Sequence, residues 1–241
     1  RRRDFIKTAA ISGTAIAFTS EKSSGENAGK YSDKLPVNLP KGLEYTLKVR
    51  DMAKSIKEND GAKFEKAAEI CADAVSSGKK VYYSVYGHNE EQNILDTKPG
   101  RPSFLIPFTG KETLETGDVL ISQSTEHCAK AIEKGAVSIG IIYPFTPNKF
   151  QGQGIVSAGY EGPYMEDICK VWFWDRTPFT VGIMDFNNMP WKSVPAHGAL
   201  DGIILGLILA KTIDKLIQRG VKVEPADFMP GAIIEYGKYY R

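Results

Sequence analysis

The chain has 241 residues, 42% hydrophobic and 25% charged, a balance typical of a globular protein with one sizeable core. Its formal net charge of +2, without a Lys/Arg run beyond the first three residues, argues against nucleic acid as a partner. Cys71, Cys128 and Cys169 are far apart and predict neither a zinc motif nor a disulfide framework. At most one disulfide can form, and three buried thiols is the favoured interpretation.

The first 20 residues read RRRDFIKTAAISGTAIAFTS. Arg2, Arg3 and Phe5, followed by Ile6 and Lys7, resemble the twin-arginine (Tat) export signal, which precedes a weakly hydrophobic segment. Residues 8–19 are too short to span a membrane. We therefore expect the Tat machinery to be a partner and the protein to be periplasmic or otherwise exported, and soluble after signal removal. A disordered basic tail is the alternative interpretation.

The domain boundaries follow changes in composition. Residues 21–42 are rich in Ser, Gly, Asn, Lys and Pro and indicate a linker. From residue 43, apolar residues recur at helical spacing and predict two helices, separated by a break at Asn59-Asp60-Gly61, with Cys71 on the apolar face of the second. We expect the main domain to cover residues 43–223 and a tail to cover 224–241.

The chain then alternates between short apolar runs and helical segments. Near-continuous apolar strands separated by helices predict an α/β fold, with a parallel sheet covered on both faces. The final helix is apolar all round over residues 202–210 and is expected to be buried. The predicted strands are residues 81–85, 103–108, 118–122, 136–142, 169–174 and 179–186; the predicted helices are 124–134 and 196–218, and 143–165 is a long loop.

In parallel sheets, ligands bind beyond the carboxyl ends of the strands, which draws attention to the turn after residue 121. Ser122, Ser124 and Thr125 supply hydroxyl groups there, and a helix N-terminus attracts anions. The turn therefore suits a phosphate. The same hydroxyls also suit simple helix capping, which is favoured from the local sequence because no Lys or Arg is adjacent.

Several segments together resemble the sugar isomerase (SIS) domain family, in particular its stand-alone phosphosugar-isomerase-like bacterial members. They are the two N-terminal helices, a first strand ending in Gly87-His88, and the stretches GDVLISQS, EKGAVSIGI and VPAHGALDGIILGLILAKTIDKLIQRGV. The resemblance implies a three-layer α/β/α sandwich with a central, mostly parallel five-stranded sheet of flavodoxin- or Rossmann-like type, preceded by two helices. It also implies a homodimer or higher homo-oligomer, a sugar or sugar-phosphate ligand, and aldose–ketose isomerisation in some members.

The resemblance and the residue chemistry together select candidate site residues. Isomerisation needs a base that moves a proton between adjacent carbons, which His88, His197 or Glu126 could supply. A loop histidine is more often a packing residue, and Glu126 could simply complement the helix dipole. No metal site or cofactor is predicted, because HxH, HExxH and GxGxxG patterns are all absent. The ligand-binding candidates are Gly87, Ser122, Ser124, Thr125 and His127.

Two functions remain open at this stage. The first is an exported isomerase-like enzyme that acts on a sugar or sugar phosphate. The second is a non-catalytic binding or structural protein that keeps the SIS fold and dimer surface, because Asn89 and Thr125 replace the family's usual Ser and Gly. Trp172 and Trp174 share one strand face and are expected in the core or an interface.

Overall fold

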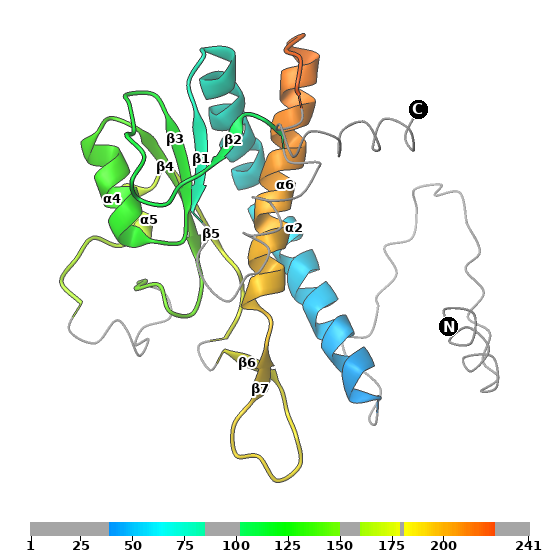
Figure 1. The fold of residues 1–241 in the computed structure, drawn as a ribbon. Helices are drawn as coiled ribbons and strands as arrows, with labels where there is room; N and C mark the ends of the chain where they lie inside the picture. Colours follow the sequence, from blue (N-terminus) through cyan, green and yellow to red (C-terminus); the bar gives the residue numbers. More distant parts are fainter. Residues whose placement is uncertain (1–38, 85–101, 150–159, 179–180, 225–241) are drawn as a thin grey trace, which may run out of the picture. The chain divides into compact units, whose positions relative to one another are not determined.

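A computed structural model describes residues 39–84, 102–149, 160–178 and 181–224 (Figure 1). The described chain is an α/β domain with a five-stranded, all-parallel sheet in the order β2-β1-β3-β4-β5. The predicted signal, most of the linker, Gly87, His88 and residues 225–241 lie outside these ranges. The α/β class and the parallel sheet predicted from the alternating pattern are confirmed.

The strands form where the sequence places its apolar runs. β1, β3 and β4 are almost wholly buried, which is why their sequences lack the polar alternation of a half-exposed strand. Each predicted strand differs from the observed one by a few residues at its ends. The strands of the sheet are β1 (Val81–Ser84), β2 (Leu105–Pro107), β3 (Val119–Ser122), β4 (Val137–Ile142) and β5 (Val171–Trp174).

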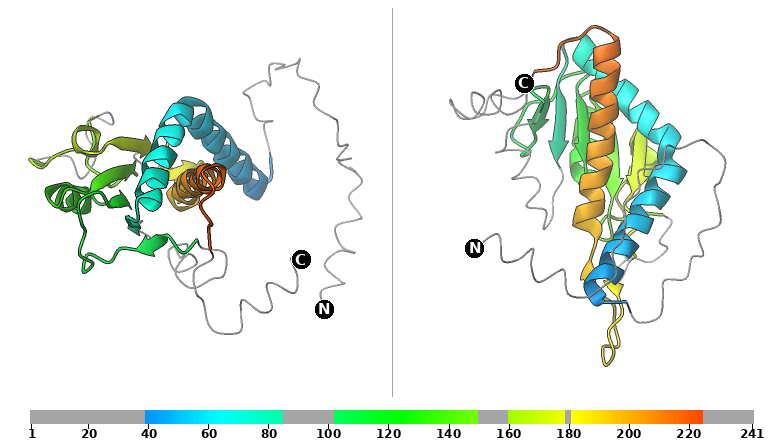
Figure 2. Two further views of the ribbon diagram at one scale, coloured as in Figure 1. Left: turned by 90° about the horizontal axis from the view of Figure 1, so that it is seen from above. Right: turned by 90° about the vertical axis from the view of Figure 1, so that its right-hand side faces the viewer.

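Helices cover both faces of the sheet (Figures 1 and 2). Side chains alternate along a strand, so consecutive residues such as Ile141 and Ile142 enter different apolar clusters. On one face lie α2 (Lys41–Ser76) and α6 (His197–Gln218); on the other lie α4 (Thr125–Glu133) and the short α5 (Met165–Ile168).

The described residues before β1 form one helix, α2, where the sequence pattern favours two. The expected break does not end the helix, although α2 changes direction near its middle (Figure 2). Asp60 is buried there, and its carboxylate accepts a hydrogen bond from Arg176 (2.7 Å) and pairs with Lys63 (3.0 Å). These contacts hold an otherwise unfavourable Asp-Gly pair within helical backbone.

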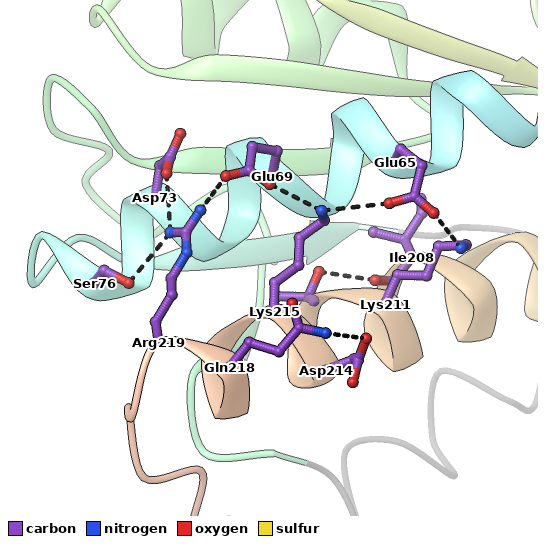
Figure 3. A network of polar contacts seen from close by, with 11 residues as sticks. Glu65, Glu69, Asp73, Ser76, Ile208, Lys211, Asp214, Lys215, Gln218 and Arg219 are labelled. Carbon is purple, nitrogen blue, oxygen red and sulfur yellow. Dashed lines mark hydrogen bonds and ion pairs between the residues drawn. The ribbon is translucent and has the colours of Figure 1, made fainter.

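Helices α2 and α6 lie side by side and are linked by a row of ion pairs (Figure 3). Lys215 binds Glu65 (3.3 Å) and Glu69 (2.9 Å), while Arg219 binds Glu69 and Asp73 (2.9 Å). Beneath this row, the apolar sides of both helices join the residues of the sheet in one continuous cluster.

The sixth predicted strand lies outside the main sheet. β6 (Gly182–Met184) pairs antiparallel with β7 (Ser193–Pro195), and this ribbon contacts the N-terminal part of α2. Tyr45 Oη donates to Pro195 O (3.1 Å), and Lys48 Nζ donates to Ile183 O (2.9 Å). Sequence alternation identified β6 as a strand but contains no information on which strand it pairs with.

The last helix is less buried than expected. Gly206 and Ala210 are exposed within its apolar stretch, and further along Ile217 is 63% exposed, so one side of α6 faces outward. The reason is that α6 packs only against α2 and the sheet, so the side of the helix that faces away from both remains exposed. Within the described ranges, the search for a helix with the length and apolarity to cross a membrane finds none.

Candidate functional site

The chain leaves the carboxyl ends of the neighbouring strands β1 and β3 in opposite directions, from β1 toward β2 and from β3 toward β4. Parallel α/β sheets characteristically bind ligands at such a point, beyond the carboxyl ends of the strands. Here the two strands end in register on Ser84 and Ser122, both fully buried. His127 from the first turn of α4 joins them, with its Nδ1 3.2 Å from Ser84 Oγ. The tertiary structure therefore brings two serines and a predicted site histidine together.

The loop between β3 and α4 is a helix cap. Ser124 Oγ accepts a hydrogen bond from His127 N (3.2 Å), and Ser122 Oγ accepts one from Ser124 N (3.0 Å). The capping interpretation of Ser124 is confirmed. Among the described residues, the amides of Thr125 and Glu126 have no acceptor, as expected for the first turn of a helix. This turn can therefore still donate two hydrogen bonds to an anion.

A cavity of about 350 Å³ opens in front of this turn. Its walls combine hydroxyl and amide groups with aromatic rings, and Glu126 is its one charged residue among those described. The lining residues come from the end of β3, the start of α4, the loop after β4 and the segment before α5: Gln123, Ser124, Thr125, Glu126, Tyr143, Phe145, Thr146, Pro147 and Tyr160.

Gln123 connects the cavity to α6. Its Nε2 donates to Asp201 Oδ2 (2.5 Å), and both residues are buried. Its Oε1 is also buried and has no hydrogen-bond donor among the described residues. Gln123 therefore fixes this part of the cavity wall to α6 through its amide nitrogen.

His197 lies behind the cavity wall. It is the first residue of α6, is 4% exposed, and its ring is 6.2 Å from that of Tyr143 and 6.5 Å from that of Phe145. Burial raises the pKa of Tyr143, which keeps its hydroxyl neutral as a hydrogen-bond donor or acceptor. The prediction that His197 lies at the start of the last helix is confirmed, whereas a catalytic role for it stays a prediction.

Glu126 and His127 are neighbours in sequence but lie in different environments, one exposed to solvent and the other partly buried. Glu126 is exposed and pairs with Lys130 (2.6 Å), whose hydrogen bond lowers the pKa of the glutamate. His127 packs edge-on against Phe108 (5.2 Å between centroids), and burial lowers its pKa, so its neutral imidazole is favoured. A lowered pKa makes Glu126 a weaker base than an unpaired glutamate.

The structure divides the predicted site residues into three groups. Ser124, Thr125 and Glu126 line the cavity. Ser122, His127 and His197 support it from beside or behind. Gly87 and His88 lie outside the described residues, three and four positions after Ser84.

Sequence reasoning missed the residues after β4, although its own rule could have found them. Tyr143, Phe145 and Thr146 follow the carboxyl end of a parallel strand, the same position that selected Ser122 and Ser124. Asp201 also gave a signal, because an acid at the start of an apolar helix needs a buried partner. Nothing in the sequence selected Tyr160, which lines the cavity from a distant segment.

Trp172 and Trp174 occupy one face of β5, as their spacing predicts, but they are half-buried rather than part of the core. Lys63 Nζ lies 3.8 Å from the centre of the Trp172 ring, and the Arg176 guanidinium lies 5.0 Å from that of Trp174. The four residues line a separate cavity of about 270 Å³. The indole faces therefore already carry cations.

Within the described part of the chain, no cluster of His, Cys, Asp or Glu is arranged to hold a metal ion. Comparison of the sequence with protein-family models and with curated proteins finds no match.

Proposed function

We propose that this chain is a carbohydrate-binding α/β/α domain of the SIS type, and that it binds a sugar or sugar phosphate in the cavity before α4. The observation that carries the proposal is the cavity itself. It combines the free amides of a helix N-terminus, several hydroxyl groups and aromatic rings at the carboxyl edge of a parallel sheet.

The chemistry of the walls suits a polyhydroxylated ligand. Tyr143 and Tyr160 can exchange hydrogen bonds with sugar hydroxyls. The Phe145 side chain, 41% exposed, offers an apolar surface to sugar C–H groups. The cavity volume of about 350 Å³ is large enough for a monosaccharide and its phosphate.

An anionic group on the ligand would face the first turn of α4. The helix N-terminus carries about half a positive charge, and the amides of Thr125 and Glu126 point outward from it. No Lys or Arg lines the described wall, so these backbone groups are the main source of attraction for a phosphate. We therefore expect anion affinity to depend on Ser124, which sets the direction of the helix start.

Isothermal calorimetry with the folded chain tests this function directly. The panel is pentose, hexose and heptose phosphates, the matching free sugars and inorganic phosphate. Heat with the sugar phosphates or free sugars supports the proposal, and the ratio between the two reports the contribution of the phosphate. Absence of binding across the whole panel would refute it.

Substitutions of Ser124 separate the capping role from the anion role. Ser124→Ala removes the cap and should destabilise the fold by about 1 kcal/mol. Ser124→Asp and Ser124→Asn both retain a good cap, but only Asp places a negative charge at the anion position. We expect the Asp variant to bind sugar phosphates at least tenfold more weakly than the Asn variant, with similar thermal stability. Thr46→Ala removes an exposed hydroxyl from α2, far from the cavity in sequence, and is the control for the loss of a hydroxyl elsewhere.

Aldose–ketose isomerisation is a second candidate, favoured by the imidazole and carboxylate at the start of α6. His197 and Asp201 are one helical turn apart and lie behind Tyr143 and Gln123. The test is incubation of each bound sugar phosphate in D₂O, followed by proton NMR. If the enzyme abstracts the proton beside the carbonyl, deuterium replaces it and its signal disappears. This exchange should be absent in His197→Asn. Binding without exchange assigns the domain to the non-catalytic alternative.

Export through the Tat route remains part of the proposal and is supported by the residue pattern at positions 2–7. Fractionation of cells that produce the parent chain and the Arg2→Lys/Arg3→Lys double variant tests it. We expect the parent outside the cytoplasm and the variant inside. Recovery of the parent from the cytoplasm alone would contradict export.

Homodimer formation is proposed on the resemblance and is supported by the outward side of α6, where Ile217 is 63% exposed. Light scattering coupled to size exclusion measures the mass in solution. Ile217→Lys should shift a dimer toward monomer, while Lys57→Ala, on the exposed side of α2, should leave the mass unchanged.

A further inference from the structure

Cys128 and Cys169 belong to one small apolar cluster on the α4 face of the sheet, together with Ile142 and Met165. Cys128 is fully buried in the first turn of α4, and Cys169 is the partly exposed residue that ends α5. They are 41 positions apart in sequence (169 − 128), so only the tertiary fold brings them together.

Strand β4 forms the floor beneath the pair. Ser138 Oγ donates to Cys128 O (3.0 Å). Two residues further along the same face, a Cβ on Gly140 would lie 3.1 Å from Cys169 Sγ. The missing side chain of Gly140 thus leaves the space that the Cys169 sulfur occupies. Both cysteines therefore lie over the same face of β4. The neighbouring side chain of Cys128, followed by burial, raises the pKa of Cys169.

We propose that Cys128 and Cys169 form a reversible disulfide that fastens the first turn of α4 to the end of α5. The proposal is independent of the ligand proposed above. It also concerns the site, because the loop that the bond would close contains Tyr143, Phe145 and Tyr160 of the cavity wall.

The oxidant is a low-molecular-weight disulfide, such as oxidised glutathione. Cys169, the more exposed residue, loses its proton, and its sulfur then attacks one sulfur of the oxidant and releases one thiolate. Because its pKa is raised, this first step is slow at neutral pH and faster in alkaline solution. The thiolate of Cys128 then attacks the Cys169 sulfur of the mixed disulfide and releases the second. The two cysteine protons pass to the two released thiolates, so the protein loses two electrons and two protons and the oxidant becomes two thiols.

Cys71 provides an internal control. It lies on the opposite face of the sheet, in the cluster between α2 and α6, where burial raises its pKa to about 12. It belongs to a different cluster from the other two cysteines and is 1% exposed, so neither a second thiol nor the oxidant reaches it. It should therefore remain reduced under conditions that oxidise the pair.

The test is incubation of the folded, reduced full chain with oxidised glutathione at mildly alkaline pH. Free thiols are then titrated in denaturant. We expect a fall from three thiols to one, and peptide mapping should give a Cys128–Cys169 cross-link. Closing a loop of this length should raise the melting temperature by roughly 5–10 °C, and dithiothreitol should reverse the change.

Two variants keep the outcome decisive. Cys169→Ser, at a partly exposed position, should fold and retain two titratable thiols after the same treatment. Cys71→Ala should still form the cross-link. Three free thiols in the treated parent, glutathione retained on Cys169, or a cross-link to Cys71 would each overturn the proposal.

Discussion

On one face of the sheet, the long helices α2 and α6 bury a single apolar cluster that reaches from β1 to β5. On the other face, α4 and the four-residue α5 cover two smaller clusters, and the space beside them remains open as the candidate cavity. Both faces share the same strands, so the sheet does not explain the difference. The length of the covering helices does, because a short helix leaves strand ends and loops accessible.

The comparison suggests a division of labour between the two faces. The α2/α6 face has the larger share of the buried apolar side chains and should dominate the free energy of unfolding. The α4 face positions polar groups around a cavity, so fewer apolar side chains pack against one another there. The following experiments test that division.

The largest effect is expected from neighbouring isoleucines of β4. Ile141 and Ile142 are both 0% exposed but enter opposite faces. Ile141→Ala should cost about 4 kcal/mol, and Ile142→Ala about 2–3 kcal/mol, because the thinner α4 face can relax around the lost atoms. Urea unfolding of both variants measures the difference. Equal costs, or a larger cost for Ile142, would contradict the division.

A pH-dependent effect is expected at the carboxyl end of β5. Burial raises the pKa of Asp175 to about 7 from its ordinary 3.8, against the opposing effect of two hydrogen bonds from Thr177. The folded protein therefore holds a proton that the unfolded chain has lost, and stability decreases as pH rises from about 4 to about 7, on the order of 4 kcal/mol. Asp175→Asn should remove this decrease from a urea-midpoint profile. A profile identical to the parent's would exclude Asp175 as its source.

A smaller effect is expected where α2 meets the end of β5. Asp60 is buried and binds both Arg176 and Lys63. Asp60→Asn keeps the size of the side chain but removes its charge, and should destabilise the domain by about 2 kcal/mol. Asp51→Asn, on the exposed side of the same helix, is the matched control and should change stability very little.

The smallest effect is expected from the ion pairs in Figure 3, because they are exposed. Lys215→Ala should lower the melting temperature slightly at low salt and not measurably at high salt. Lys57→Ala, which has no ion pair among the described residues, should show no such salt dependence. A large, salt-independent loss in Lys215→Ala would mean that its aliphatic chain contributes packing between α2 and α6.

Much of the fold could be predicted because it depends on local pattern. Apolar runs located all five strands of the sheet, and Ser124 with the following helical stretch located the start of α4. Local pattern failed at Asp60-Gly61, where a distant arginine compensates for poor helix propensity. Local pattern identified β6 as a strand but failed to predict its pairing. Its partner β7 is only three residues long, and both strands lie outside the main sheet.

The candidate site could be predicted only in part. Ser124, Thr125 and Glu126 were among the residues that the sequence selected, and they line the cavity, while their roles stay predictions. Asp201, Tyr143 and Tyr160 come from three other segments, and sequence spacing does not show that they meet. The role of His127 also depends on a contact with Ser84, 43 residues away in sequence.

The sequence by itself determined the five strands of the main sheet and the positions of α4 and α6, because side-chain periodicity and capping act over a few residues. The tertiary structure alone decided which side chains share a space: Gln123 with Asp201, and Cys128 with Cys169. These pairs arise from strand order and from the lengths of the helices that cover each face. Both are set by the packing of the whole domain, which no short stretch of sequence specifies.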